Sequence, residues 1–353
     1  MVAPGSVDDD VTAERLTEVL RRGGGLDTGR VVEVGVDTSR TTLVSTIERL
    51  RLRYAGGEGP ATLIRKRPRH DIAPDLADIL RNEVAFYARV APAMPAGRLP
   101  RCYGIGGAEE GPRYVLLEDL TDSHAIVSEW PVPPTLEQCE RIMETYAAFH
   151  GQWWDDARLG DSIGTWLDTS GVFDRHLAEF SKRLAAFADR LGDRMSPERL
   201  SLYERLLEAA PRLLARYRTH RGLTLVHGDA HVWNALHPRD PATGTIRLID
   251  WDGWRVYTAT DDLSYMIALH WYPDRRRRLE RRLLEHYHAT LTAHGVERYP
   301  LSSLLDDYRL SVLWQITTPV WQASFRLTPA VWWSHLERIM LAVDDLDCRA
   351  LLG

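Results

Sequence analysis

Three oxygen-bearing side chains lie at the ends of two apolar runs in the second half of the chain. The run TLVHGDAHVWN at 224–234 places Asp229 five residues before Asn234, and the run IRLIDWDGW at 246–254 ends its apolar part at Asp250. A carboxylate can accept the proton of a nearby hydroxyl, and carboxylate and amide oxygens suit Mg²⁺. Phosphoryl transfer from a nucleotide needs both groups, and also a cation on the phosphates that are not transferred. The spacing is therefore typical of phosphoryl transfer.

Both runs resemble the signature motifs of a known family. HGDAHVWN and IDWD are similar to the two motifs of the aminoglycoside phosphotransferase and choline kinase family. The resemblance implies that Asp229 is the catalytic base and that Asn234 and Asp250 are the Mg²⁺ ligands. It also implies that His227 organises the loop, with Asp252 as a secondary participant.

The required cation has few lysine candidates, because the chain contains only two, Lys66 and Lys182. Lys66 is the one that lies in a strand-like run of the N-terminal part. Lys66 lies in TLIRKRP, a strand-like run in which alternation places it on the face opposite Arg65. The family pairs its strand lysine with a glutamate on the next helix. Glu83, in RNEVAFY, lies where the resemblance implies that partner.

The resemblance also implies how the nucleotide is held. YVLLEDL at 114–120 resembles the family's hinge, whose backbone groups would bind adenine; the residues concerned are Glu118, Asp119 and Leu120. The phosphate-covering loop should lie in VGVDTSRTTLVS at 34–45, which contains a single glycine, Gly35. Ser39 and Thr41 are the expected donors to the phosphates there. Further along, AVDDLDCRALL at 342–352 resembles the tail of the family's ecdysteroid-kinase-like branch.

The elements that must position these residues change along the chain. Strand-like runs dominate the first part, at 30–36, 41–54, 61–67, 102–105 and 113–117, with a helical pattern around 76–87. Helical patterns dominate after the polar, proline-rich stretch 121–134, beginning near Thr135, Ser196, Asp274, Ser302 and Pro329. We therefore predict an α+β, protein-kinase-like fold of two lobes. The N-terminal antiparallel sheet lobe, 1–121, would bind the nucleotide, and the larger helical C-terminal lobe, 122–353, would carry the catalytic loop and the substrate pocket.

Composition narrows the class of partner. The net charge of −6 and a pI near 6.1 argue against a nucleic acid as the main partner. The sequence contains no run of 18 apolar residues, which a membrane-spanning helix would need. MVAPGSVDDD at 1–10 lacks a signal-peptide pattern, so we expect a cytoplasmic protein. The three cysteines are far apart and predict neither a disulfide framework nor a thiolate metal site. The oligomeric state stays open.

These features together predict an ATP-dependent kinase, with GTP as the other candidate nucleotide and Mg²⁺ as the metal. The partner would be a small molecule that offers a hydroxyl group: an antibiotic, another natural product, a sugar or an amino alcohol. An antibiotic acceptor would fit a role in resistance. A polycationic acceptor would need carboxylates, and candidates for these are Asp261, Asp262, Asp306 and Asp307.

Two other classes of function are kept as alternatives. One is a nucleotide-binding pseudokinase that acts as a regulatory module. The other is a zinc hydrolase, because His227, Asp229 and His231 form an H-x-D-x-H pattern whose side chains can share a metal.

Overall fold

The computed structural model describes residues 11–69, 74–106, 113–242 and 244–353. The segment 1–10, for which the sequence predicts no signal peptide, lies outside these ranges. Contacts within the chain form two units: unit 1 is Met1–Val127 with Trp233–Trp254, and unit 2 is Ser128–Val232 with Arg255–Gly353. The segment with Asn234 and Asp250 thus belongs to unit 1, although it lies beyond the predicted lobe boundary at 121/122, which stays a prediction. The division of roles between a nucleotide-binding and a substrate-binding lobe stays a prediction.

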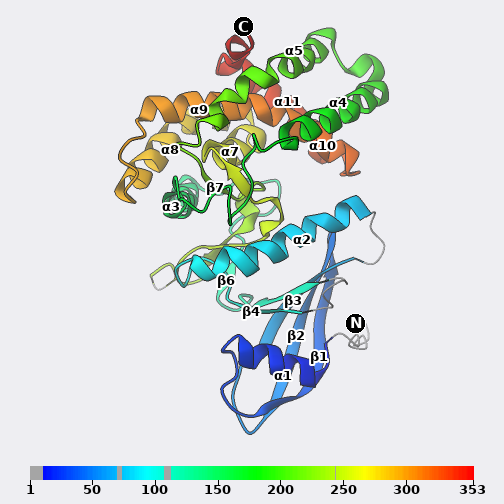
Figure 1. The fold of residues 1–353 in the computed structure, drawn as a ribbon, viewed down its shortest axis with the longest axis vertical. Helices are drawn as coiled ribbons and strands as arrows, with labels where there is room; N and C mark the ends of the chain where they lie inside the picture. The colour runs from blue at the N-terminus through cyan, green and yellow to red at the C-terminus, as the bar shows by residue number, and fades with distance from the viewer. Residues whose placement is uncertain (1–10, 70–73, 107–112, 243) are drawn as a thin grey trace. The chain divides into compact units, whose positions relative to one another are not determined.

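Unit 1 contains a five-stranded antiparallel sheet with the order β1-β2-β3-β5-β4 (Figure 1). Its strands are β1 (Arg30–Thr41), β2 (Ser45–Ala55), β3 (Thr62–Pro68), β4 (Cys102–Gly106) and β5 (Tyr114–Glu118). The predicted strand at 41–54 begins only at Ser45, because a turn separates β1 from β2. Thr42 N–H donates to the Ser45 carbonyl at 2.8 Å, and Ser45 N–H donates to Thr42 Oγ1 at 3.0 Å.

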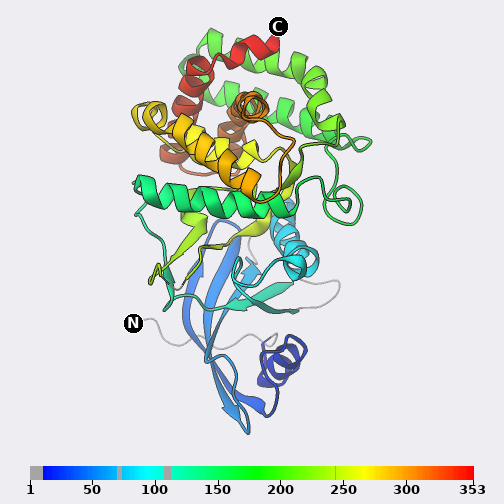
Figure 2. The same cartoon turned by 90° about the vertical axis from the view of Figure 1, so that its left-hand side faces the viewer.

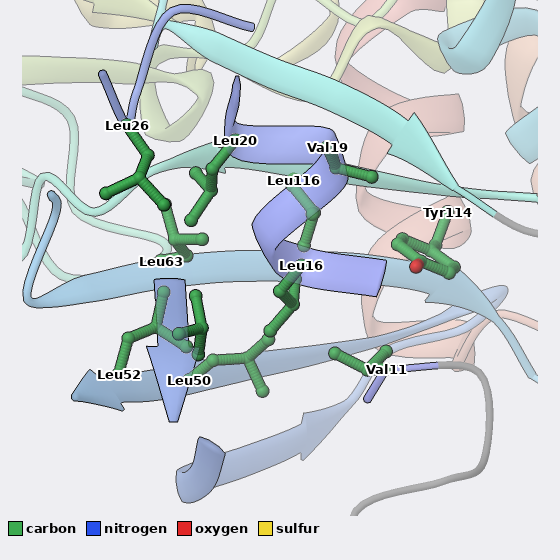
Figure 3. Close-up of a cluster of buried hydrophobic side chains, with 11 residues drawn as sticks. Val11, Leu16, Val19, Leu20, Leu26, Leu50, Leu52, Leu63, Tyr114 and Leu116 are labelled. Carbon is green, nitrogen blue, oxygen red and sulfur yellow. The ribbon is translucent and has the colours of Figure 1, made fainter. Parts of the chain in front are cut away.

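One face of this sheet packs against α1 (Ala13–Arg22). Thr12 caps the helix by accepting a hydrogen bond from Arg15 N–H at 3.2 Å. The buried cluster that joins helix and sheet is shown in Figure 3 and includes Leu16, Leu20, Leu50, Leu63 and Leu116. Since successive strand residues point to opposite faces, Leu63 on the α1 side places Lys66 on the other side of β3.

The rest of unit 1 consists mainly of a second helix and a short hairpin. The helix is α2 (Pro74–Arg89), followed by the 3-10 turn η1 (Ala91–Ala93). The hairpin consists of β8 (Ala235–Pro238) and β9 (Arg247–Leu248), and β6 (His124–Ala125) pairs with β8. It is flanked by the 3-10 turns η3 (Val232–Asn234) and η4 (Trp251–Gly253). Within the apolar run that ends at Asp250, the strand β9 covers Arg247–Leu248.

Unit 2 is mostly helical (Figures 1 and 2). Its helices are α3 (Leu136–Gln152), α4 (Val172–Leu191), α5 (Pro197–Leu213), α6 (Ala215–Arg218), α7 (Thr260–Ser264), the π-helix η5 (Tyr265–Leu269), α8 (Pro273–Ala293), α9 (Leu301–Trp314), α10 (Thr318–Ser324) and α11 (Pro329–Asp345). Shorter 3-10 turns are η2 (Gly192–Arg194), η6 (Gln315–Thr317) and η7 (Cys348–Leu352). β7 (Thr224–Val226) and β10 (Arg255–Tyr257) form a small antiparallel pair, and α3 packs against α8.

The predicted helix starts in unit 2 are confirmed. Thr135 and Gln138 form a capping box at α3, with hydrogen bonds of 3.3 and 2.9 Å, and Ser196 caps α5. The long helix α4 was not predicted. The three cysteines, Cys102, Cys139 and Cys348, are free. Over the described ranges, no helix is both long enough and apolar enough to span a bilayer.

Candidate functional site

Lys66 and Glu83 form a buried ion pair inside unit 1. Lys66 comes from β3 and Glu83 from α2, and the distance between Lys66 Nζ and Glu83 Oε2 is 2.6 Å. Their side chains are 7% and 1% exposed, so water scarcely competes for either charge. Lys66 Nζ also donates to Asp250 Oδ1, which places a second carboxylate on the same cation. The structure therefore brings together three of the residues that we predicted from sequence.

The segment that follows Asp250 is fastened to α2 by two kinds of contact. Asn82 Nδ2 donates to the carbonyls of Asp252 and Trp254 at 2.7 and 3.2 Å, and Trp254 Nε1 donates back to the Asn82 carbonyl at 2.8 Å. One turn further along α2, Phe86 stacks on Trp251 with ring centroids 4.0 Å apart. The helix that carries Glu83 thus also fixes the segment that carries Asp250. The sequence analysis did not identify Asn82 and Phe86. The only signal available was their closeness to Glu83 in the run NEVAFY at 82–87.

Asp250 has a backbone conformation that few side chains adopt. Its φ of 69° and ψ of 65° lie in the left-handed region, which Asp and Asn tolerate better than most residues do. Such strain costs on the order of 1 kcal/mol and is concentrated at functional sites. The Asp250 side chain is 38% exposed, so its carboxylate is accessible while it contacts Lys66.

The electrostatics of the cluster keep Lys66 protonated. Burial by itself lowers the pKa of Lys66, but the charges of Glu83 and Asp250 outweigh it and hold that pKa above its usual value. Lys66 is therefore a fixed cation, oriented from two sides.

Asn234 and Asp250 supply the donor atoms that Mg²⁺ needs. Asn234 is buried at the end of η3, just before β8, and its carbonyl accepts a hydrogen bond from Ile249 N–H at 3.0 Å, so the two predicted ligands lie on adjacent segments. A carboxylate and an amide oxygen are the hard donors that Mg²⁺ prefers, and they fit the predicted metal. For the zinc alternative, no group of three or more His, Cys, Asp and Glu side chains in the described ranges is arranged to hold a metal ion.

Asp229 belongs to unit 2, in the loop that follows β7. The loop is held by Asp262 on α7, whose carboxylate accepts hydrogen bonds from the backbone N–H groups of His227 and Gly228 at 2.7 and 2.8 Å. Asp262 in turn contacts His150 Nε2 at 3.0 Å, and both side chains are fully buried. Burial raises the pKa of Asp262, but its hydrogen bond with His150 and the nearby His227 hold that pKa below its usual value. Asp262 is thus an ionised anchor for the loop.

This anchoring corrects one expectation about the acceptor pocket. Asp261 and Asp262 are buried, and Asp261 forms an ion pair with Arg255. Asp307 is also buried and pairs with Arg216, with 2.6 Å between Asp307 Oδ1 and Arg216 Nε. These three carboxylates have internal partners and do not form a surface for a polycation. The TDDL run at 260–263, which suggests pocket carboxylates in the sequence, instead supplies the anchor of the loop.

His231 lies beside the predicted base and begins a row of histidines in unit 2. Its Nε2 is 3.5 Å from Asp229 Oδ2, and both side chains are partly exposed. Behind it, the His231 and His270 ring centroids are 5.7 Å apart, and those of His270 and His335 are 4.5 Å apart. Asp229 therefore has a histidine as a neighbour on its own loop.

The predicted hinge residues already have partners within unit 1. Glu118 N–H donates to the Arg101 carbonyl at 2.8 Å, and the Leu120 carbonyl accepts the N–H groups of Ser123 and His124. Asp119 accepts from Arg49 Nε at 2.6 Å and from Thr121 Oγ1 at 2.6 Å. Burial raises the pKa of Asp119, but these hydrogen bonds lower it to about 2. The Asp119 side chain is therefore structural, and adenine binding by the backbone stays a prediction.

Ser39 and Thr41 lie near the end of β1. They pair with Glu48 and Thr46 of β2, and both are exposed. The turn beyond them is closed by hydrogen bonds between Thr42 and Ser45. Their contact with phosphates stays a prediction.

Comparison with known proteins adds a family and a fold. The model of the phosphotransferase enzyme family matches residues 46–299, well over half of the chain. No curated protein sequence matches the chain significantly.

Several solved structures resemble the chain in fold. The choline kinase from Cryptosporidium parvum Iowa II is 9% identical, with a TM-score of 0.56 over 97% of this chain and 98% of that one. The GDP complex of wild-type aminoglycoside 2'-phosphotransferase-IIIa is 13% identical, with a TM-score of 0.52 over 96% and 100%. The complex of APH(2")-IIIa with GDP and kanamycin is 12% identical, with a TM-score of 0.50 over 95% and 99%. At such identities the similarity shows the fold, and it confirms the predicted α+β class.

Proposed function

Because the chain belongs to the phosphotransferase enzyme family, we propose that it transfers the γ-phosphate of ATP, or of GTP in its place, to a hydroxyl group of a small molecule. The single observation that carries this proposal is the cluster of Lys66, Glu83 and Asp250 in unit 1. Burying a lysine with carboxylates carries a desolvation cost that their mutual attraction can fail to repay, so such a cluster is poorly explained by stability alone. A nucleotide phosphate is the partner that such a cation would serve.

Each residue has a distinct role in the proposed mechanism. Lys66, oriented by Glu83, would bind the phosphates that are not transferred and neutralise their charge. Asp229 would orient the acceptor hydroxyl and accept its proton, while Asp262 holds the backbone of the Asp229 loop in place. Asn234 and Asp250 would hold Mg²⁺, which supplies charge stabilisation on the transferred group when it is bound.

The choice of nucleotide and acceptor is guided by the solved structures with a similar fold. Two of them are GDP complexes and one also contains kanamycin, while another is a choline kinase. We therefore propose testing GTP beside ATP, and testing aminoglycosides, other antibiotics, sugars and amino alcohols as acceptors. The net charge of −6 supports a small molecule over a nucleic acid as the partner.

The first experiment measures thermal stability with ATP, GTP, ADP and a non-hydrolysable analogue, each with Mg²⁺ or EDTA. A ligand that binds only the folded chain adds about 2.7 kcal/mol at a hundredfold excess over its Kd. We expect stabilisation by nucleotide that depends on Mg²⁺. An absence of stabilisation by every nucleotide would contradict the proposal. An acceptor screen that follows release of the nucleoside diphosphate would then separate a kinase from a pseudokinase.

The role of Asp229 is tested by Asp229→Ala. We expect turnover to fall by at least a hundredfold while the nucleotide Kd changes less than threefold, because the carboxylate acts on the acceptor. Asp193→Ala, at an exposed position in η2, is the matched control and should retain turnover. Full turnover by Asp229→Ala would exclude it as the base.

A further inference from the structure

Unit 1 contains a cavity that the proposed phosphotransfer does not use. Its volume is about 950 Å³, and it is lined by the end of α1, the loop 91–100 after α2, and β4. Among the described residues that line it, the only member of the candidate site is Glu118. Small-molecule sites usually range from about 300 to 1,000 Å³, so the cavity is large enough for a ligand.

The polar lining of this cavity is mainly cationic. Three arginines line it, Arg22, Arg101 and Arg247, against a single carboxylate, Glu118. Two of the arginines, Arg101 and Arg247, are held in place by backbone carbonyls. Arg101 NH2 donates to the carbonyls of Gly23 and Gly24 at 2.9 and 2.7 Å, and Arg247 NH1 donates to that of Leu99. The lining therefore favours an anion.

Two donors at the cavity wall lack an acceptor within the described parts of the chain. They are the Tyr87 hydroxyl and Arg247 Nε, both of which are buried atoms. Tyr87 is 3% exposed, and Arg247 is oriented by a hydrogen bond of 3.1 Å from its NH1 to the Leu99 carbonyl. A buried donor left unpaired is destabilising, and a ligand oxygen placed here would pair with it.

The other walls are apolar. Val19, Met94, Leu99 and Ile105 contribute side chains, and the Tyr103 ring stacks under Arg101 at 4.8 Å. Such a wall suits an apolar or aromatic body. We propose that this cavity binds a small organic carboxylate whose charged group reaches Arg247 and Tyr87 and whose apolar body lies against these walls.

The test uses phenylacetate as the probe and phenylacetamide as its uncharged analogue. The full chain is labelled with ¹³C at its methionine methyl groups, of which there are six. We expect the Met94 signal to shift saturably with phenylacetate, while Met143, buried in α3 of unit 2, stays unchanged. Phenylacetamide should bind at least tenfold more weakly. A missing Met94 response, or equal affinity for the two probes, would overturn the proposal.

Substitutions then locate the charged group. Arg247→Gln should weaken phenylacetate binding at least tenfold, whereas Arg98→Gln, a neighbouring arginine outside the lining, should change the Kd less than twofold. Arg22→Gln is the second variant, because Arg22 is exposed and its loss should not disturb folding. We expect it to weaken binding about threefold. Wild-type affinity in both Arg247→Gln and Arg22→Gln would overturn the assignment.

This site can be tested separately from the proposed function. Phenylacetate binding is measured without nucleotide, so a failure to bind nucleotide would leave the cavity assignment unaffected. Conversely, a failed phenylacetate titration would leave the proposed role of Lys66 in phosphotransfer unaffected.

Discussion

At the scale of single residues, Lys66 combines a structural and a functional role. It neutralises Glu83, which is almost fully buried, so removing the lysine leaves a carboxylate without its cation. We expect Lys66→Met to lower the free energy of unfolding by about 3–5 kcal/mol, the typical cost of breaking a buried pair from one side. Urea unfolding measures this loss, and a nucleotide titration measures the loss of binding.

A double variant separates the two roles. Lys66→Met with Glu83→Gln removes both charges, so most of the lost stability should return while nucleotide binding stays weak. Lys182→Met, an exposed lysine on α4, is the matched control and should behave as the wild type. If nucleotide affinity returned together with stability, Lys66 would have no direct role at the phosphates.

Asp250 permits a nearly isosteric test of the metal site. Asn tolerates the left-handed backbone as Asp does, so Asp250→Asn should fold with a stability within about 1 kcal/mol of the wild type. Loss of the charged oxygen should abolish the Mg²⁺ dependence of nucleotide stabilisation. The comparison is the midpoint of thermal unfolding in Mg²⁺ and in EDTA. A Mg²⁺ response that survived in the variant would remove Asp250 from the metal site.

At the scale of elements, α7 supports the loop that carries the predicted base. Asp262→Ala would leave two backbone donors and His150 without their shared acceptor. We expect it to lower the free energy of unfolding by about 3 kcal/mol or more, because each unpaired buried group costs about 1–3 kcal/mol. Turnover should fall with it. Asp274→Ala, at the exposed start of α8, provides the control in the same urea titration, and equal stability of the two variants would contradict the anchoring role.

Elements with strong local signals could be predicted from the sequence, and those that depend on distant partners could not. The capping box at Thr135 and the Ser196-Pro197 pair predicted where α3 and α5 begin, because capping residues act on the adjacent turn of the helix. Helix α1 offers only a short apolar stripe around Leu16 and Leu20. That stripe becomes a helix face when strands from later in the chain cover it.

At the scale of the whole molecule, the same contrast between local sequence signals and long-range contacts decides which residues of the candidate site could be predicted. Asp229, Asn234 and Asp250 are predicted as site residues from motif spacing and family resemblance, and Lys66 also from strand alternation and the scarcity of lysine. The anchoring role of Asp262, which the sequence suggested only as a pocket carboxylate, was not predicted, because it depends on segments that meet only in the folded chain. The grouping of 233–254 with the N-terminal residues has the same origin: β8 pairs with β6, which lies more than a hundred residues earlier.

The buried histidines of unit 2 tie the stability of the whole chain to pH. His335 is 3% exposed, and its Nδ1 is 2.9 Å from Gln322 Oε1. Burial, with Arg338 and His231 nearby, lowers the pKa of His335 to about 3. Burial and the neighbouring His335 and His231 also lower the pKa of His270 well below its usual value. Both side chains are therefore neutral in the folded chain at pH values where the unfolded chain binds protons.

The sign of the effect follows from this difference in proton binding. An unfolded histidine has a pKa of about 6.5, so between pH 6.5 and about 3 the unfolded chain holds a proton that folded His335 does not, and stability falls as the pH falls. The expected slope is about 1.4 kcal/mol per pH unit for each such histidine. Urea unfolding between pH 7.5 and 5 should show it, and His335→Gln should reduce the slope by one histidine's share because an amide does not titrate. His294→Gln, at an exposed position after α8, should keep the wild-type slope. A His335→Gln slope equal to that of the wild type would mean that His335 does not stay neutral in the folded chain, because only a proton bound differently by the two states can change stability with pH.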